Sequence, residues 1–253
     1  MRYVAVLGVA ARQTLNARGA IAARSAFYVV VLLIFSRLWG AMSGFIGAAE
    51  FLWYLALTEW TTLAMPHFYV GIEEDVRRGD IAYRLARPVS YFWAKFAEGM
   101  GEVLARLAAL APVGLVAAWS FAGGLPADPR GLLLAVPLSL LAAAVLVLMQ
   151  IAIGLSAFWF QDASPCHWIV QKLLFVFGGL FIPLDIYPEW MQTIAHCTPF
   201  APLVYGIGRS AFGFDPATAA RTALLIIAWG VVLLGLVGWL YRRSLRVLNV
   251  NGG

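Results

Sequence analysis

Six apolar stretches, each close to the length of a membrane-crossing helix, divide this chain. A helix needs roughly 20 apolar residues to cross the ~30 Å of hydrocarbon in a bilayer. Hydrophobic residues make up 62% of the sequence and charged residues only 12%, which excludes an ordinary soluble domain. The sequence therefore predicts an all-α polytopic membrane protein that forms a single domain over residues 1–253. The six predicted spans are Phe27–Phe45, Phe51–Val70, Val103–Gly123, Leu132–Phe160, Trp168–Pro183 and Thr218–Tyr241.

The basic residues predict how these spans are oriented. If the amino terminus is cytoplasmic, one side of the membrane receives at most Arg130, Arg209 and Arg221. The cytoplasmic side receives Arg2, Arg12, Arg18, Arg24, Arg77, Arg78, Arg84, Arg87, Lys95, Lys172, Arg242, Arg243 and Arg246. Cytoplasmic loops carry such an excess of Lys and Arg, so we expect a multi-pass protein of the cell membrane with both termini in the cytoplasm. The same bias explains the net charge of +5, and nucleic acid is not an expected partner.

Two further segments are expected to lie at the membrane without crossing it. Residues 1–25 mix apolar residues with four spaced arginines, which is typical of an amphipathic helix in the interface. Residues 184–213 are apolar but interrupted by Pro188, Pro199 and Pro202, too often for a span. We expect this second segment to form a re-entrant hairpin of two short helices on the external side, because non-helical backbone at membrane depth needs protein or water around it.

A polar segment between the second and third spans stands out from the apolar sequence around it. Gly79 can adopt a left-handed backbone and close a preceding helix. Asp80 can cap the first amides of a new helix, and Pro88 ends that helix. This pattern predicts a short helix over Ile81–Arg87 within a cytoplasmic segment of residues 71–98.

At these residues the chain resembles the permease subunits of type-2 ABC exporters. Those subunits carry, between their second and third membrane helices, a cytoplasmic segment of the form Gly-Thr-Leu-Glu-x-Leu-Leu-x-Ser-Pro-Val. The residues that match it in spacing are Gly79, Ile81, Leu85, Pro88 and Val89. The departures are Ala82 for the Glu, Arg84 for one Leu and Arg87 for the Ser. The six-span layout and the external hairpin are also similar to that family.

The resemblance implies that this chain is the transmembrane subunit of an ATP-driven exporter. Its short helix would be a coupling helix seated in a separate ATPase subunit, which would bind ATP and Mg²⁺ in place of any cofactor in this chain. A second permease subunit, identical or homologous, would complete the transporter. The substrate class stays open among small molecules, drug-like compounds and lipids. The residues that the resemblance assigns to coupling are Gly79, Asp80, Ile81, Arg84, Leu85, Arg87 and Pro88.

The sequence carries no motif that would make this chain an enzyme. It has no Gly-x-x-x-x-Gly-Lys-Ser/Thr loop for ATP, and its Ser, His and Asp residues form no nucleophilic arrangement. The histidines His67, His167 and His196 fall in different segments without paired spacing, so no metal site is expected.

Two charges fall inside predicted spans, Arg37 in the first and Glu59 in the second. They lie at similar depth, and charges inside membrane helices are usually paired or face a cavity. We expect a structural ion pair between the two helices. The alternative is a proton or ion relay, which would make the protein a secondary transporter. A non-transporting membrane scaffold, with the polar segment as a docking site only, is the other alternative.

Overall fold

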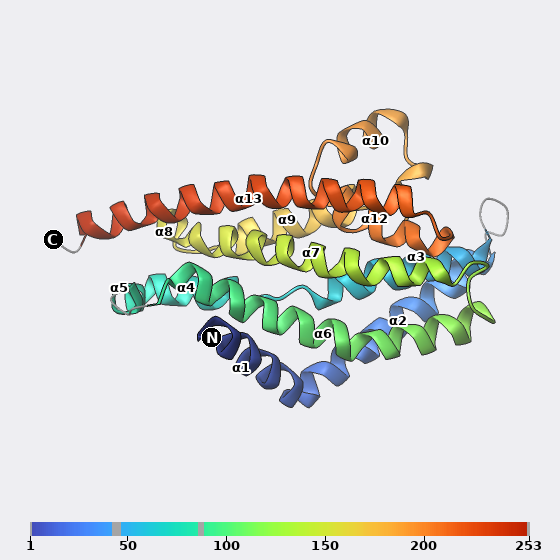
Figure 1. Cartoon of the computed structure of the whole chain (residues 1–253), viewed down its shortest axis with the longest axis horizontal. Helices are drawn as coiled ribbons and strands as arrows, with labels where there is room; N and C mark the ends of the chain where they lie inside the picture. Colours follow the sequence, from blue (N-terminus) through green and yellow to red (C-terminus); the bar gives the residue numbers. More distant parts are fainter. Residues whose placement is uncertain (1, 42–46, 86–88, 252–253) are drawn as a thin grey trace.

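The structure, a computed structural model, describes residues 2–41, 47–85 and 89–251, and it contains no β-strand within these ranges. Its frame consists of four long helices that run along the long axis of the molecule (Figure 1). The four are α2 (Arg18–Ala41), α6 (Tyr91–Ala122), α7 (Arg130–Leu155) and α13 (Pro216–Asn251). Helix α7 packs against both α6 and α13, and α2 packs against α6. The predicted all-α class is confirmed.

Four helical segments are long and apolar enough to cross a membrane among the residues described: Arg18–Leu38, Tyr91–Ala122, Arg130–Phe160 and Pro216–Arg246. The last turns of the first predicted span, 42–45, lie outside the described residues. The helices at the second and fifth predicted spans are shorter. These are α3 (Ala48–Ala64) with 17 residues and α9 (Ser164–Phe177) with 14. The count of six spans stays a prediction.

The structure corrects the second predicted span, Phe51–Val70. Helix α3 ends at Ala64, and the chain is not helical at Met65–His67 before α4 (Tyr69–Arg77) begins. The cause is Pro66, which has no amide hydrogen to continue the ladder and disfavours the helical backbone at the residue before it. The span over Leu132–Phe160 is likewise divided, into α7 and the short α8 (Ala157–Phe160).

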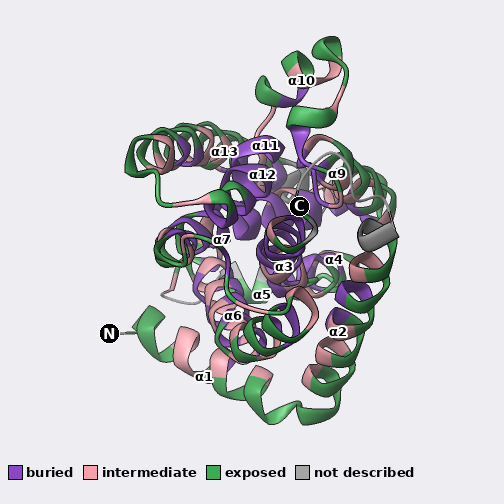
Figure 2. Cartoon of the chain, turned by 90° about the vertical axis from the view of Figure 1, so that its right-hand side faces the viewer, coloured by how far each residue is buried: buried purple, intermediate pink, exposed green. Residues whose placement is uncertain are grey.

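Helix α3 forms the centre of the bundle. All residues of its segment Phe51–Glu59 are buried, whereas α2 and α13 expose many large apolar side chains on their outer faces (Figure 2). The side chains of α3 also satisfy irregular backbone beyond the end of α9. The Tyr54 hydroxyl donates to the Gly179 carbonyl oxygen, and the Thr58 hydroxyl donates to the Leu180 carbonyl oxygen at 2.9 Å. A non-helical turn is thereby kept inside the protein with its polar groups paired.

The segment 184–213 folds into several short pieces. Helix α10 (Glu189–His196) stands out from the bundle (Figure 2), close to the first helix expected there. The second expected helix is instead divided into α11 (Phe200–Leu203), α12 (Tyr205–Gly208) and the 3-10 turn η2 (Arg209–Phe212). Every residue from 200 to 208 is buried, so the chain returns from α10 into the protein interior. The chain thus leaves the bundle at α10 and returns to it, and both the re-entrant character and the external location of this segment stay predictions.

The first helix, α1 (Arg2–Asn16), bends away from α2 at Ala17 and packs along α6 (Figure 1). The two helices meet at Gly101 of α6, where an added Cβ would lie 2.3 Å from the Leu7 carbonyl oxygen. Glycine is therefore required here for close approach of two backbones. Arg2 and Arg12 lie on the exposed side of α1. Residues 2–16 thus have the amphipathic character expected of residues 1–25, whereas residues 18–25 form the first turns of α2. The interfacial location of α1 stays a prediction.

We predict that Gly101→Ala destabilises the protein by about 1–3 kcal/mol, because the new methyl group must push α1 away from α6. Thermal unfolding of the purified protein in detergent measures this change. The matched control is Gly8→Ala on α1, where an added Cβ meets nothing within 4 Å. That control should be neutral or slightly stabilising, since alanine favours a helix by about 0.5–1 kcal/mol over glycine. Equal loss of stability in both variants would contradict the close contact.

Candidate functional site: a polar junction at one end of the bundle

The polar segment forms a helical corner at the end of the molecule. Helix α4 ends at Arg77, and Gly79 follows with φ of +75°, the left-handed backbone expected there. Helix α5 (Asp80–Leu85) begins directly after it and runs beside α4 (Figure 1). Asp80 is its first residue and Leu85 its last. Arg87 and Pro88 lie outside the described residues.

Asp75 of α4 connects three helices at this corner. Its buried carboxylate accepts a hydrogen bond of 2.9 Å from the Tyr91 hydroxyl of α6. The same carboxylate lies 3.1 Å from Nη2 of Arg84 on α5 and 3.7 Å from Nζ of Lys95 on α6. One acidic side chain thus ties the short α5 to the helix before it and to the long helix after it.

Lys95 supplies the second half of this network. Its side chain is only 8% exposed, and its Nζ also lies 3.0 Å from Oε2 of Glu98 one turn further along α6. A buried ammonium is tolerated only with such partners, because leaving water costs several kcal/mol. We call the residues Asp75, Arg84, Tyr91, Lys95 and Glu98 the polar junction. Its two cations and two carboxylates balance.

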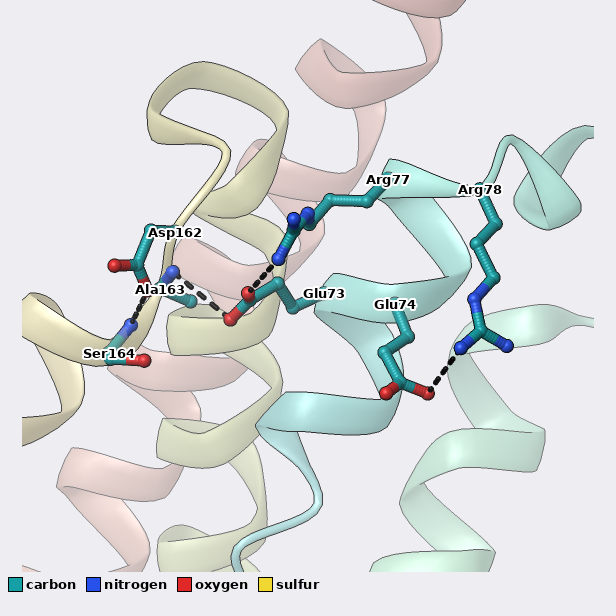
Figure 3. Close-up of polar contacts among 7 residues, drawn as sticks. All are labelled: Glu73, Glu74, Arg77, Arg78, Asp162, Ala163 and Ser164. Atoms are coloured by element: carbon teal, nitrogen blue, oxygen red, sulfur yellow. Dashed lines mark hydrogen bonds and ion pairs between the residues drawn. The ribbon is translucent and has the colours of Figure 1, made fainter.

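A second acidic residue of α4 points to another part of the chain (Figure 3). Oε2 of Glu73 accepts a hydrogen bond of 3.2 Å from the Ala163 amide, and its Oε1 lies 3.4 Å from Nη1 of Arg77. Ala163 immediately precedes α9. Glu73 and Asp75 are two positions apart in the sequence, which places them about 200° apart around the helix. Helix α4 therefore holds α9 on one side and the polar junction on the other.

Asp162 organises the start of α9 beside this contact. Its Oδ1 accepts a hydrogen bond of 2.9 Å from the Ser164 amide (Figure 3). This hydrogen bond favours the charged carboxylate and lowers the pKa of Asp162 below its usual value. The ion pair between Glu74 and Arg78, at 3.9 Å, is exposed and contributes little to stability.

The side chains of α5 divide into an inner and an outer set. Ile81 is 1% exposed, so it anchors α5 to the bundle and is not part of the outer surface. Tyr83, by contrast, is 69% exposed. Arg84 is partly exposed but is engaged by Asp75 within this chain. Of the residues assigned to coupling from sequence, Ile81 and Arg84 thus have internal contacts that the sequence did not indicate.

The structure does not bring Arg37 and Glu59 together as an ion pair. Arg37 lies exposed on α2, whereas Glu59 is buried on α3. Among the described residues no cation lies within 4.0 Å of the Glu59 carboxylate. The two residues were expected to pair because they lie at similar depth along their helices. Depth alone does not determine the direction in which each side chain points around its helix axis.

Sequence reasoning also missed which residues meet across segments. Tyr91 and Lys95 were not identified as partners of Asp75. The one sequence pattern that could have indicated this network is the spacing of Lys95 and Glu98, three residues apart near the start of an apolar helix. The rings of His67 and His167 lie 5.1 Å apart, and His167 stacks on Tyr69, although the histidines are far apart in sequence. These contacts depend on how α4 packs against α9, which a linear pattern does not contain.

The comparison with known families agrees with this architecture. A family model described as ABC-2 type transporter matches residues 4–212, a range that includes α5, α10, α11 and α12. No curated protein matches the chain as a relative.

We predict that Asp75→Asn lowers the free energy of unfolding by about 1–3 kcal/mol, because Arg84 and Lys95 lose a charged partner. Asparagine keeps the shape of the side chain, so the change reports on charge. The measurement is thermal unfolding in detergent. Glu74→Gln, an exposed neighbour on the same helix, is the control and should change stability by less than about 0.5 kcal/mol. If both variants melt with the parent, Asp75 does not hold the junction together.

Proposed function

Because the chain belongs to the ABC-2 type transporter family, we propose that it is the membrane subunit of an ATP-driven exporter and that α5 docks on a separate ATPase subunit. A multi-pass permease role follows from the family and from the long apolar helices. We propose in addition that α5 has a coupling role. It uses Gly79 and Asp80 to form the corner, Ile81 to anchor it and the outer face of α5 for contact.

The observation that carries this proposal is the attachment of α5 to α6 through Asp75. A docking element that moves a membrane helix needs a stiff connection to it. The 3.1 Å contact of Asp75 with the partly exposed Arg84 and its buried contacts with Tyr91 and Lys95 provide one. The buried ion pair with Lys95 is screened little by salt. A displacement of α5 would therefore move the first turns of the 32-residue helix α6.

The contact between Glu73 and Ala163 offers a second route for the same movement. Helix α4 would carry displacement of α5 to the start of α9 as well as to α6. Both routes begin on one helix, so they would act together. We propose that closure of the ATPase uses α4 in this way to reorient several helices in one step.

ATP and Mg²⁺ would bind to the partner subunit, and this chain would supply only the permeation route. Two permease subunits, identical or homologous, would form that route along their shared interface. Export of a small-molecule, drug-like or lipid substrate fits such an arrangement. The termini, α5 and the polar junction would lie in the cytoplasm of a cell-membrane protein, in keeping with the distribution of basic residues.

The two native cysteines test this topology. Cys197, which is exposed at the end of α10, should react in intact cells with a membrane-impermeant maleimide in the variant Cys166→Ser. Cys166 should react only after the cells are opened, in the variant Cys197→Ser. The double variant is the control for background labelling. Labelling of Cys166 in intact cells would contradict the proposed orientation.

Tyr83 provides the sharpest test of docking, because it is a large and strongly exposed side chain among those of α5 that the structure describes. We predict that Tyr83→Asp weakens capture of the ATPase subunit by about tenfold or more, since exposed tyrosines dominate many interfaces. The measurement is co-purification of the two subunits together with ATP-dependent transport. Reversing the charge of Arg84 is less informative, because it would also break the contact with Asp75.

The matched control is Trp190→Asp on α10, an aromatic residue of 66% exposure that lies away from α5 (Figure 1). This variant should retain the ATPase at the parental yield. Thermal unfolding of both variants verifies that each one folds. Retention of the ATPase by a folded Tyr83→Asp variant would refute docking through α5.

A further inference from the structure

A mixed-charge cavity of about 240 Å³ lies where α1 and α2 meet α6. Helix α1 contributes Gln13 and Thr14 to its wall, and α2 contributes Arg24. Helix α6 contributes Glu98, Glu102 and Arg106. We call this space the headgroup cavity. It opens beside the basic helix α1 and is distinct from the outer face of α5.

Arg24 is the cation of this cavity that forms no direct ion pair among the described residues, although the Glu102 carboxylate is near enough to favour its charge. Arg106 lies 2.9 Å from Glu102, and Glu98 lies 3.0 Å from Lys95. Among the described residues no carboxylate lies within 4.0 Å of Arg24. A guanidinium has five N–H donors in a rigid fork that matches the oxygens of a phosphate.

Both guanidinium groups are held in place by the interrupted end of α3. Nη1 of Arg24 donates to the Leu63 carbonyl oxygen at 3.0 Å, and Nη1 of Arg106 donates to the Met65 carbonyl oxygen at 3.0 Å. The last carbonyls of a helix have no partner within the helix. The break at Pro66 thus fixes two cations at the wall of the cavity before any ligand arrives.

The cavity lies at the level where the predicted membrane spans begin. Arg24 precedes the first span, which starts at Phe27, and Glu98 and Glu102 precede the third, which starts at Val103. With the spans predicted in this way, the cavity would lie at the level of the lipid headgroups. A ligand at this height can place charged groups in the cavity and an apolar part in the membrane.

A separate apolar groove lies further along the same two helices, towards the interior of the predicted membrane. It encloses about 500 Å³ and is lined by Val29 of α2 and by Val113, Val116, Ser120 and Phe121 among others of α6. On α6, Glu102, Arg106, Val113 and Ser120 follow one another at spacings of four or seven residues. They therefore lie on one face of the helix. That face is charged at the cavity and apolar further along.

We propose that a phospholipid with a phosphoethanolamine headgroup binds in the headgroup cavity and lays an acyl chain in the apolar groove. Its phosphate binds Arg24, and its ammonium donates to the carboxylates of Glu98 and Glu102. A choline headgroup cannot donate these hydrogen bonds, and a glycerol headgroup has no cation for the carboxylates. The cavity is smaller than the ~300–1,000 Å³ that encloses a drug-sized ligand, which fits a headgroup whose tails stay outside.

The test is native mass spectrometry of the full chain from nanodiscs that contain equal amounts of phosphatidylethanolamine, phosphatidylcholine and phosphatidylglycerol with identical acyl chains. We expect the retained lipid to be mainly phosphatidylethanolamine. Arg24→Gln should reduce retention about tenfold, because it removes a charged hydrogen-bonding group. Arg12→Gln is the matched control, since it removes an exposed arginine of α1 outside the cavity wall. It should retain the lipid.

Two further variants test recognition of the lipid headgroup and binding of the acyl chain separately. Glu98→Gln also removes the ion pair with Lys95, so thermal unfolding must first show that this variant folds. The folded variant should lose the preference over phosphatidylcholine while some lipid is retained. Val116→Trp should reduce retention of all three lipids by filling the groove. Both tests hold even if Arg24→Gln fails to fold.

The proposal is overturned if the three lipids are retained equally by the parent, or if Glu98→Gln keeps the parental preference. It is also overturned if millimolar inorganic phosphate displaces the lipid and binds in its place, since the site would then recognise free phosphate. Loss of retention with unchanged capture of the ATPase would support the lipid site independently of the docking proposal.

Discussion

The need to pair every backbone polar group inside an apolar environment governs this fold. An unpaired amide or carbonyl in hydrocarbon costs several kcal/mol, so each interruption of a helix must have a partner nearby. At the break at Pro66, Arg24 and Arg106 donate hydrogen bonds to the carbonyl oxygens of Leu63 and Met65. In the turn after α9, Tyr54 and Thr58 donate to backbone carbonyl oxygens in the same way. At both breaks, side chains from neighbouring helices donate to the backbone carbonyls that the helices leave unpaired.

In the polar junction, buried charges likewise need partners. Asp75 and Lys95 are both buried, and each would be unfavourable without the other. Arg84 and Glu98 complete the set from partly exposed positions, so the cluster is neutral as a whole and reaches the surface at α5. Helix α5 has only six residues, too few for a stable helix alone. Its position therefore depends on this cluster and on the burial of Ile81.

The sequence predicted those features that depend on local chemistry. The left-handed backbone at Gly79, the short helix after it and the long apolar helices follow from residue types and periodicity. The end of α3 also follows from a local feature, Pro66. The prediction missed it because the apolar residues on both sides of Pro66 suggested one continuous span. The pairing of Asp75 with Lys95, the approach of His67 to His167 and the separation of Arg37 from Glu59 depend on helix rotation and packing. Helix rotation and packing are properties of the assembled bundle, and long hydrophobic stretches of sequence define them poorly.

The contact of α1 with Gly101 has a consequence for the order in which the chain assembles. Leu7 leaves the ribosome 94 residues before Gly101 (101 − 7), which at ~5–20 residues per second is a delay of roughly 5–20 s. During that interval α6 does not exist, and α1 has no protein surface to cover its apolar side. Its basic and apolar faces suit it to wait on the membrane surface. The amphipathic character of α1 thus serves biogenesis first, and the finished bundle then uses the same helix as a wall.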